Sequence, residues 1–264
     1  MAKNYTKNRW AHLARYAVER GLRCCGLYQG RAYCHILFVE DKGKKFDVVK
    51  KNLLKGVKAD LLKNLHTDAH HLNSSQILCY NFFRPLIDKN GNAKQELVDL
   101  LAKQHIIIEK GANCTFEYED DLGDKTQFDF HIKSGETEVF FEIKYTENCF
   151  ASYSKESSAR TQYKERYAVQ FGKQNCLVEK PQDEDDFIKK AKNDYQLYRN
   201  TVRITDKKKY VVLLYPGENE SVEKQAKEFV ETKVKPEYQE NIKRVYWENI
   251  VDKESELYKK YFAE

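Results

Sequence analysis

Apolar residues recur at helical spacing in the first part of the chain. One helix face carries Trp10, Leu13, Ala14, Ala17 and Val18, and Gly21 follows at a position where helices commonly end. The same pattern predicts a strand over residues 33–39, a helix over 48–65, and a capped, buried helix over 77–83 that stops before Pro85. These elements indicate a mainly helical N-terminal segment.

Residues 88–92, Asp-Lys-Asn-Gly-Asn, form the clearest turn in the chain, and the pattern changes after them. Alternating or continuous apolar runs predict strands near Cys114 and over residues 127–133, 138–145 and 209–215, with helices over 93–104, 187–198 and 222–230. This order is typical of a mixed α/β domain. We expect a mainly helical accessory lobe over residues 1–92 and an α/β core over residues 93–264.

Gly135 and Glu136 are a plausible two-residue hairpin turn, because Gly occupies the position that a type II′ turn requires. Residues whose numbers sum to 271 then face each other. The apolar pairs Phe128–Ile143, Phe130–Phe141 and Ile132–Val139 share one face, and Asp129 opposes Glu142 on the other. At roughly 5 Å, two carboxylates repel by about 3 kcal/mol at an effective dielectric near 20. The pair is therefore strained unless a cation lies between the two acids or one acid stays protonated.

Mg²⁺ would relieve this repulsion, because it prefers oxygen ligands from one or two carboxylates. Lys144 lies two residues beyond Glu142, so its ammonium group should reach the same site. Two acids and a lysine suit phosphodiester hydrolysis, in which charge develops on phosphate and water. The alternative is a solvated strand on which these charges simply pair with one another.

Asp129 and Glu142-Ile143-Lys144 resemble the D…ExK signature of the PD-(D/E)XK restriction-endonuclease-like superfamily. Residues 71–76 (HLNSSQ), 81–83 (NFF) and 142–147 (EIKYTE) more closely resemble a bacterial branch of restriction endonucleases, and the likeness spans about residues 10–247. One departure is that Phe128, rather than Pro, precedes Asp129. The resemblance implies a central mixed sheet flanked by helices.

The resemblance also implies a DNA nuclease that depends on Mg²⁺ and accepts Mn²⁺. Asp129 and Glu142 would bind the metal, the Ile143 carbonyl would add a ligand, and Lys144 would serve the attacking water. In that superfamily an acid from the first core helix often completes the metal shell, and Glu96 is the candidate here, with Asp99 as its rival. A surface acid on an amphipathic helix is an equal account of either residue.

Several polar residues are candidate substrate contacts. Asn73, Ser75 and Gln76 could bind phosphate or bases, or could belong to the cap of a buried helix. Gln196 lies on the helix after the catalytic strand and could face the site. Arg166 belongs to a segment that interleaves basic and aromatic residues, which suits either a DNA-tracking surface or a solvated one.

Composition restricts the class of protein. The 264 residues carry 46 basic and 41 acidic side chains, and the resulting charge of +5 is compatible with nucleic acid without requiring it. The longest apolar run covers residues 210–215, far below the roughly 20 residues of a membrane span. Seven cysteines without a CxxC pair, and no basic-then-apolar leader, favour reduced thiols in the cytoplasm.

Together these features predict a metal-dependent endonuclease that hydrolyses DNA, in restriction or defence. The alternatives are a non-catalytic nucleic-acid-binding protein that keeps the nuclease fold, and a structure-specific or RNA nuclease. Double-strand cleavage by one compact chain would favour a homodimer. The sequence identifies no partner methyltransferase.

Overall fold

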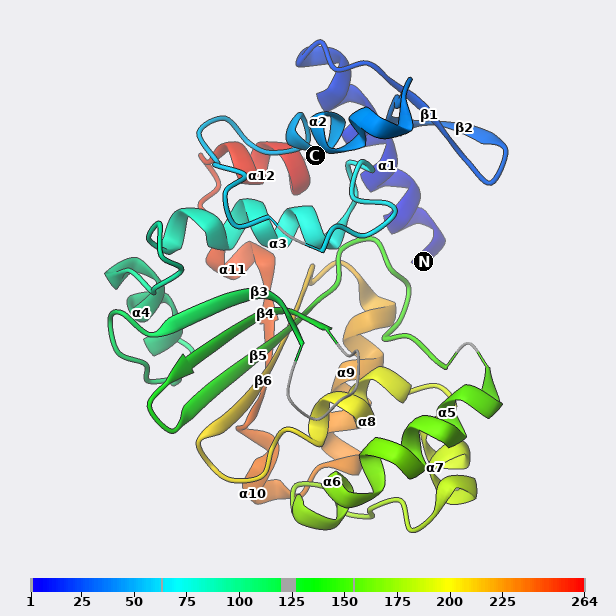
Figure 1. Cartoon of the computed structure of the whole chain (residues 1–264), viewed down its shortest axis with the longest axis vertical. Helices are drawn as coiled ribbons and strands as arrows, with labels where there is room; N and C mark the ends of the chain where they lie inside the picture. Colours follow the sequence, from blue (N-terminus) through cyan, green and yellow to red (C-terminus); the bar gives the residue numbers. More distant parts are fainter. Residues whose placement is uncertain (1, 63, 120–126, 154, 264) are drawn as a thin grey trace.

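The computed structural model describes residues 2–62, 64–119, 127–153 and 155–263. Its centre is a five-stranded sheet in the order β3-β4-β5-β6-β7, with helices on both faces (Figure 1). The strands are β3 (Asn113–Glu119), β4 (Gln127–Ser134), β5 (Thr137–Ile143), β6 (Lys209–Tyr215) and β7 (Ile242–Tyr246). The pairs β3–β4 and β4–β5 are antiparallel, whereas β5–β6 and β6–β7 are parallel. The predicted α/β fold with a mixed central sheet is confirmed.

Helices cover the two faces of the sheet separately. One face lies under α3 (Ser75–Phe83), α4 (Gln95–Ala102), α11 (Trp247–Ile250) and α12 (Glu256–Tyr261), and the other under α7 (Glu184–Ala191), α8 (Tyr195–Thr201) and α9 (Glu220–Lys233) (Figure 1). The remaining helices are α1 (Ala2–Glu19), α2 (Lys45–Lys50), α5 (Glu156–Gln162), α6 (Ala168–Lys173) and α10 (Pro236–Gln239). No helix in the part of the chain that the structure describes combines the length and apolar character that crossing a lipid bilayer requires.

Coverage of both faces explains why β5 and β6 are nearly continuous apolar runs, since alternate side chains enter different cores. On β5, Phe141 belongs to the core beneath α3 and Phe140 to the core beneath α8 and α9. Phe83 of α3 stacks on Phe130 with ring centroids 4.2 Å apart and meets Phe141 edge-on at 5.0 Å. Aromatic packing therefore fixes α3 against the middle of the sheet.

The N-terminal elements agree only in part with the sequence pattern. The first helix ends just before Gly21, whose φ is +62°, as predicted. The predicted capped helix is α3, which begins two residues earlier than expected, at Ser75, and is capped by Ser74 through the backbone N–H of Ile77. The predicted strand is β2 (Arg31–Leu37), which forms a hairpin with an unpredicted partner, β1 (Cys24–Tyr28). The hairpin stands beside α1 at the edge of the molecule (Figure 1).

The predicted helix over residues 48–65 is wrong beyond Lys50, because side chains of α3 bind the backbone of this segment instead. Asn81 accepts a hydrogen bond from Leu54 N at 2.9 Å, and the Tyr80 hydroxyl donates to Lys58 O at 2.8 Å. Gln76 accepts from His66 N at 3.0 Å and donates to Asn64 O at 3.1 Å. These bonds replace the helical ones. They hold residues 51–62 and 64–66 over α3 as an irregular segment, which we call the strap.

The predicted helix over residues 187–198 is in fact two helices, α7 and α8, and β7 was not predicted at all. The Asp194 carboxylate, at the break, accepts a hydrogen bond from Gln225 of α9 at 2.9 Å. Beyond the break, Gln196 and Asn200 of α8 donate hydrogen bonds to Glu142 near the end of β5. As a result the polar face of α8 meets the end of β5.

Glu138 on β5 should make stability depend on pH. The pKa of Glu138 is lowered to about 2. The main cause is the hydrogen bond that its carboxylate accepts from His131, and the nearby Lys209 ammonium adds to the effect, although partial burial opposes ionisation. Because the folded-state pKa lies below the ordinary 4.5, this stabilisation is complete above about pH 4.5 and is lost as pH falls toward 2.

We expect Glu138→Gln to lower the free energy of unfolding by about 1–3 kcal/mol at pH 7, with the difference from wild type shrinking below about pH 4.5. Denaturant titrations at pH 7, 5 and 3.5 measure this. Glu231→Gln, at an exposed position on α9, is the control. If the difference in unfolding free energy between wild type and Glu138→Gln stayed constant with pH, the lowered pKa of Glu138 would not be its cause.

Candidate active site

The hairpin formed by β4 and β5 has the predicted register over most of its length. Partners sum to 271 from Ser134–Thr137 to Phe130–Phe141, and Gly135 has φ +59° in the turn. The paired ladder stops at Phe130. Phe128 packs on Phe140 in the opposite core, with ring centroids 5.0 Å apart, so the predicted pair Phe128–Ile143 is absent.

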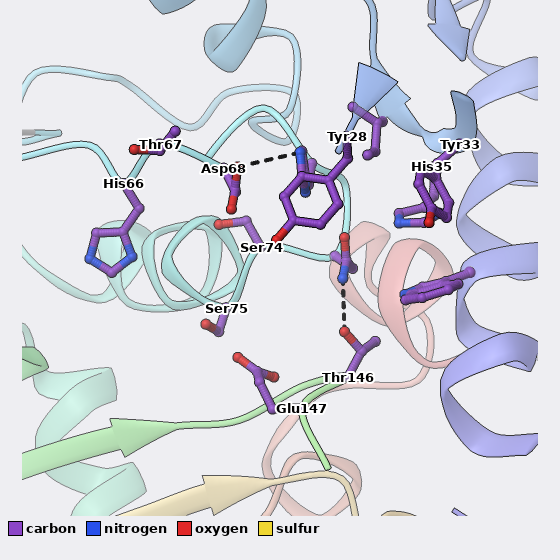
Figure 2. Close-up of a pocket in the computed structure, with 14 residues that line it drawn as sticks. Tyr28, Tyr33, His35, His66, Thr67, Asp68, Ser74, Ser75, Thr146 and Glu147 are labelled. Carbon is purple, nitrogen blue, oxygen red and sulfur yellow. Dashed lines mark hydrogen bonds and ion pairs between the residues drawn. The ribbon is translucent and has the colours of Figure 1, made fainter. Parts of the chain in front are cut away.

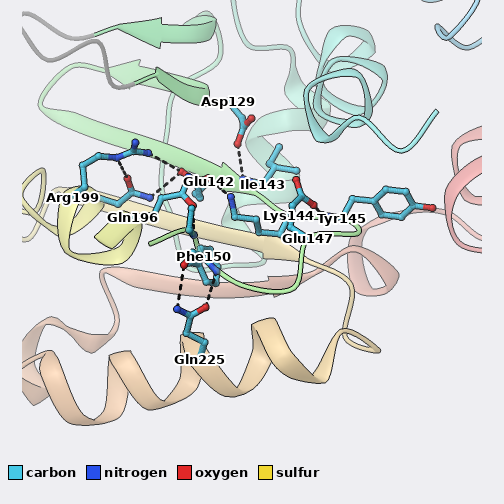
Figure 3. Close-up of polar contacts among 12 residues, drawn as sticks. Asp129, Glu142, Ile143, Lys144, Tyr145, Glu147, Phe150, Gln196, Arg199 and Gln225 are labelled. Carbon is cyan, nitrogen blue, oxygen red and sulfur yellow. Dashed lines mark hydrogen bonds and ion pairs between the residues drawn. The ribbon is translucent and has the colours of Figure 1, made fainter. Parts of the chain in front are cut away.

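Asp129 lies where this ladder stops, and its side chain is the reason. Asp129 Oδ2 accepts a hydrogen bond of 2.7 Å from the backbone N–H of Ile143 (Figure 3). A backbone donor bound to a carboxylate is not available to the neighbouring strand, so the two strands separate here. Asp129 and Glu142 are therefore close neighbours without being partners in the paired ladder, which corrects the expected cross-strand geometry.

Glu142 is buried at the end of β5, where α8 supplies most of its partners (Figure 3). Its carboxylate accepts hydrogen bonds from Lys144 Nζ at 2.8 Å, from Asn200 Nδ2 at 3.1 Å and from Gln196 Nε2. The Arg199 guanidinium lies 3.5 Å away. Burial opposes ionisation, but the charges of Lys144 and Arg199 together with these hydrogen bonds outweigh it and hold the pKa of Glu142 below its ordinary value. Glu142 is therefore a buried, fixed anion.

Lys144 is the cation of this site. Only 7% of the residue is exposed, yet the charges of Glu142, Glu147 and Asp129 outweigh the cost of burial and raise its pKa. Lys144 Nζ also lies 5.6 Å from the centre of the Phe150 ring. The ammonium group is thus charged and is held beside both acids.

The pKa of Asp129 is shifted in the opposite direction to that of Glu142. Burial, then the charge of Glu142 and then that of Glu117 raise its pKa well above the ordinary value, against the effect of Lys144. Within the described residues, its carboxylate accepts only the hydrogen bond from Ile143. Asp129 is therefore the acid that a cation at this site would stabilise most.

Glu117 is a third acid that the sequence analysis missed. It lies on β3, is 6% exposed, has a left-handed φ of +49°, and accepts a hydrogen bond of 3.1 Å from His66 Nε2. Residues of β3 and β4 pair with numbers that sum to 246, which places Glu117 level with Asp129. Extending the strand register by one strand would have revealed it.

The chemistry of these donors fits a hard divalent cation, because the carboxylates of Glu117 and Glu142 act on Asp129 while the Lys144 ammonium is hydrogen-bonded to Glu142 rather than to Asp129. No cluster of three or more metal-ligating side chains occurs among the described residues, since Glu142 is turned toward Lys144 and α8. To hold an ion together with Asp129, Glu142 would have to exchange at least one of its present hydrogen bonds.

The other predicted site residues differ in their placement. Glu96 is exposed on α4, next to the start of β3, where Ala93 N donates to Ala112 O at 2.8 Å. Asn113 at that end pairs with Lys133, which is four residues, about 13 Å, along β4 from Asp129. The structure therefore does not bring Glu96 to Asp129, and its rival Asp99 is an exposed residue of the same helix.

Among the predicted substrate contacts, Asn73 and Ser75 line a pocket that also reaches Glu147 (Figure 2). Gln76 does not line it, because both ends of its amide bind the strap over α3. Gln196 contacts Glu142 directly. Arg166 lies in the π-helical turn Tyr163–Tyr167, and within the described part of the chain no hydrogen bond or ion pair joins it to Asp129, Glu142 or Lys144.

The model of one protein family, described as Restriction Endonuclease associating with ARP, matches residues 11–264. No curated protein matches the chain, and no solved structure matches it. The family match covers both the HLNSSQ and the EIKYTE blocks and the whole central sheet. The chain therefore belongs to the restriction-endonuclease-like family Restriction Endonuclease associating with ARP.

Proposed function

We propose that this protein is a metal-dependent endonuclease that hydrolyses phosphodiester bonds of DNA, in restriction or defence. The observation that carries the proposal is the meeting of Asp129, Glu142 and Lys144 where β4 and β5 separate. Surface charges on a strand would be solvated, whereas Glu142 and Lys144 are buried. Buried acids with opposed pKa shifts are typical of functional sites.

Each residue then has a role. Asp129 and Glu142 would hold Mg²⁺ or Mn²⁺, and the Ile143 carbonyl would be a further ligand. Glu117 would complete the metal shell, the role that the sequence analysis expected of Glu96. When bound, the ion supplies charge neutralisation at the phosphate and a more acidic water. Lys144 would orient that water or stabilise the charge that develops on the phosphate. Gln196 and Asn200 would position Glu142.

The remaining parts of the proposal concern the substrate and assembly. Asn73 and Ser75 would contact the DNA from the pocket side of the site, and Arg166 would contact it farther out, on the surface formed by residues 155–173. Cutting both strands with one site per chain would require two copies, which favours a homodimer. The accessory lobe of residues 1–92 would then help to hold the substrate.

Cleavage of plasmid DNA with Mg²⁺, with Mn²⁺ and with EDTA tests the proposal. We expect cleavage with either ion, none with EDTA, and a loss of roughly 10²–10³-fold or more in Asp129→Asn. The matched control is Glu96→Gln, which removes the exposed acid of α4 and should cut like wild type. Asp129→Asn protein that still cuts at the wild-type rate would refute the catalytic site.

The same assay separates the alternatives. Salt-sensitive DNA binding without cleavage under either ion would indicate a non-catalytic binding protein. Cleavage confined to RNA or to branched DNA would keep the catalytic site and replace the substrate. Parallel reactions with duplex, single-stranded, branched and RNA substrates distinguish these outcomes.

A further inference from the structure

A pocket of about 370 Å³ opens beside the catalytic residues. The β1–β2 hairpin, α1, the segment around residues 66–71, the start of α3 and the turn after β5 form its walls (Figure 2). Its volume lies at the lower end of the roughly 300–1,000 Å³ of ligand pockets, which suits one small ring system. The pocket is thus large enough for a single heteroaromatic group and too small for a duplex.

The pocket shares residues with the catalytic site. Glu147 lines it, accepts a hydrogen bond of 2.7 Å from Tyr145 N, and is among the charges that raise the pKa of Lys144. His66, on another wall, binds Glu117, whose charge raises the pKa of Asp129. A group in this pocket would therefore belong to the same substrate as the bond that is cut.

Aromatic rings form one side of the pocket. Trp10 stacks on His35 with ring centroids 4.6 Å apart, and Tyr33 lies edge-on to His35 at 5.7 Å. Tyr28 meets His71 edge-on at 5.3 Å, and its ring projects from the hairpin across the pocket (Figure 2). Such rings offer stacking faces to a planar ligand.

The charge of the pocket argues against a phosphate ligand. No Lys or Arg is among the described residues that line it, whereas Asp68 and Glu147 are. Burial, helped by the neighbouring histidines, lowers the pKa of His35 and of His71 to about 4, so both rings are neutral at pH 7. The walls therefore combine two hydrogen-bond-accepting carboxylates with neutral rings, which favours an uncharged ligand that donates hydrogen bonds.

Three polar atoms in the walls are buried without a hydrogen bond to any described residue. They are Trp10 Nε1, Asn73 Oδ1 and His71 Nε2, the last of which lies 3.6 Å from Asp68 Oδ1. Buried polar groups without a partner destabilise a folded protein, so a ligand that supplies partners is favoured. Small rotations of the side chains would give these atoms partners on a polar ligand.

We propose that this pocket takes a nucleobase with an amino group (adenine, cytosine or guanine) that is turned out of the DNA beside the cleaved bond, an inference that rests on the nuclease function proposed above. Tyr28 and Trp10 would provide the stacking faces, and Asp68 and Glu147 would accept hydrogen bonds from the amino group. Enzymes that bind extruded bases use this combination of stacking and edge recognition.

Tryptophan fluorescence provides a direct test. The chain has two tryptophans; Trp10 is in the pocket wall and Trp247 is fully buried elsewhere, so a bound base should change mainly the Trp10 signal. Titration of wild type with adenosine, cytidine or guanosine, with thymidine for comparison, should saturate for the amino bases. Tyr28→Ala should weaken binding about tenfold. Asp68→Asn should weaken binding of cytidine more than that of thymidine.

The control is Phe46→Ala, which removes a partly exposed aromatic ring that is outside the pocket and should bind like wild type. No saturable signal with any nucleoside or with the duplexes described next would overturn the proposal. Equal affinity of wild type, Tyr28→Ala and Asp68→Asn would overturn it as well. The use of two variants guards against misfolding of either one.

A second arm identifies the source of the base. Binding to a duplex with one bulged adenine is compared with binding to the same duplex with a bulged abasic site, in EDTA so that cleavage does not contribute. Tighter binding of the adenine duplex by about tenfold, abolished in Tyr28→Ala, supports a base from DNA. If free nucleosides bind but the two duplexes bind equally, the pocket binds a base, and the ligand is a free nucleoside and not a base from DNA.

The two proposals can fail separately. Base binding without cleavage under any metal ion would refute the nuclease and keep the pocket. Metal-dependent cleavage with no base binding in either arm would refute the pocket and keep the nuclease.

Discussion

Replacing Lys144 with methionine should lower the rate of DNA cleavage by roughly 10²–10³-fold, which is the effect of removing one preorganised electrostatic group. Methionine fills similar space but carries no charge, so the buried ammonium beside Asp129 and Glu142 is lost while packing changes little. Single-turnover cleavage with Mg²⁺ measures this change. DNA affinity in EDTA should change much less than the rate.

The same substitution should also destabilise the fold. Removing one partner of a buried ion pair costs about 3–5 kcal/mol, and we expect the lower end of this range because Arg199, Gln196 and Asn200 still contact Glu142. Lys133→Met, at an exposed position on β4, is the matched control for both measurements. Wild-type cleavage by folded Lys144→Met protein would remove lysine from the proposed mechanism.

The second large effect concerns the stability of the fold. Phe83→Ala should lower the free energy of unfolding by about 3–5 kcal/mol, because the ring is fully buried between α3 and the aromatic residues Phe130 and Phe141. Denaturant unfolding followed by circular dichroism measures the loss. Phe46→Ala, with 41% of the residue exposed, should stay within about 0.5 kcal/mol of wild type.

This experiment also tests the division of the chain at residue 92. One hydrophobic core contains Leu13, Phe83 and Trp247 together with residues of the sheet, so we expect residues 1–92 and 93–264 to unfold in one transition. Two separate transitions in wild type would show that the accessory lobe is an independent unit. A loss below about 1 kcal/mol in Phe83→Ala would show that α3 contributes little to the core.

The sequence by itself determined most of the hairpin that contains the proposed catalytic residues. Alternation of apolar residues around Gly135 specifies the register over residues 130–141, because a shift by one residue would turn every side chain to the other face. The same alternation placed Asp129, Glu142 and Lys144 close to one another. These residues are close in the chain, so the alternation of apolar and polar residues over a short segment is enough to predict that they are neighbours.

Tertiary structure decided which partners these residues have once they are near each other. Gln196 and Asn200, which hold Glu142, are 54 and 58 residues away from it in the chain. Glu117 comes from the neighbouring strand, and the irregular strap over α3 replaces a predicted helix because distant side chains bind its backbone. The pocket joins Trp10 to Glu147. Periodicity in a sequence describes neighbours along one element, whereas charge pairing, burial and cavity shape depend on which elements meet, so only the fold could supply them.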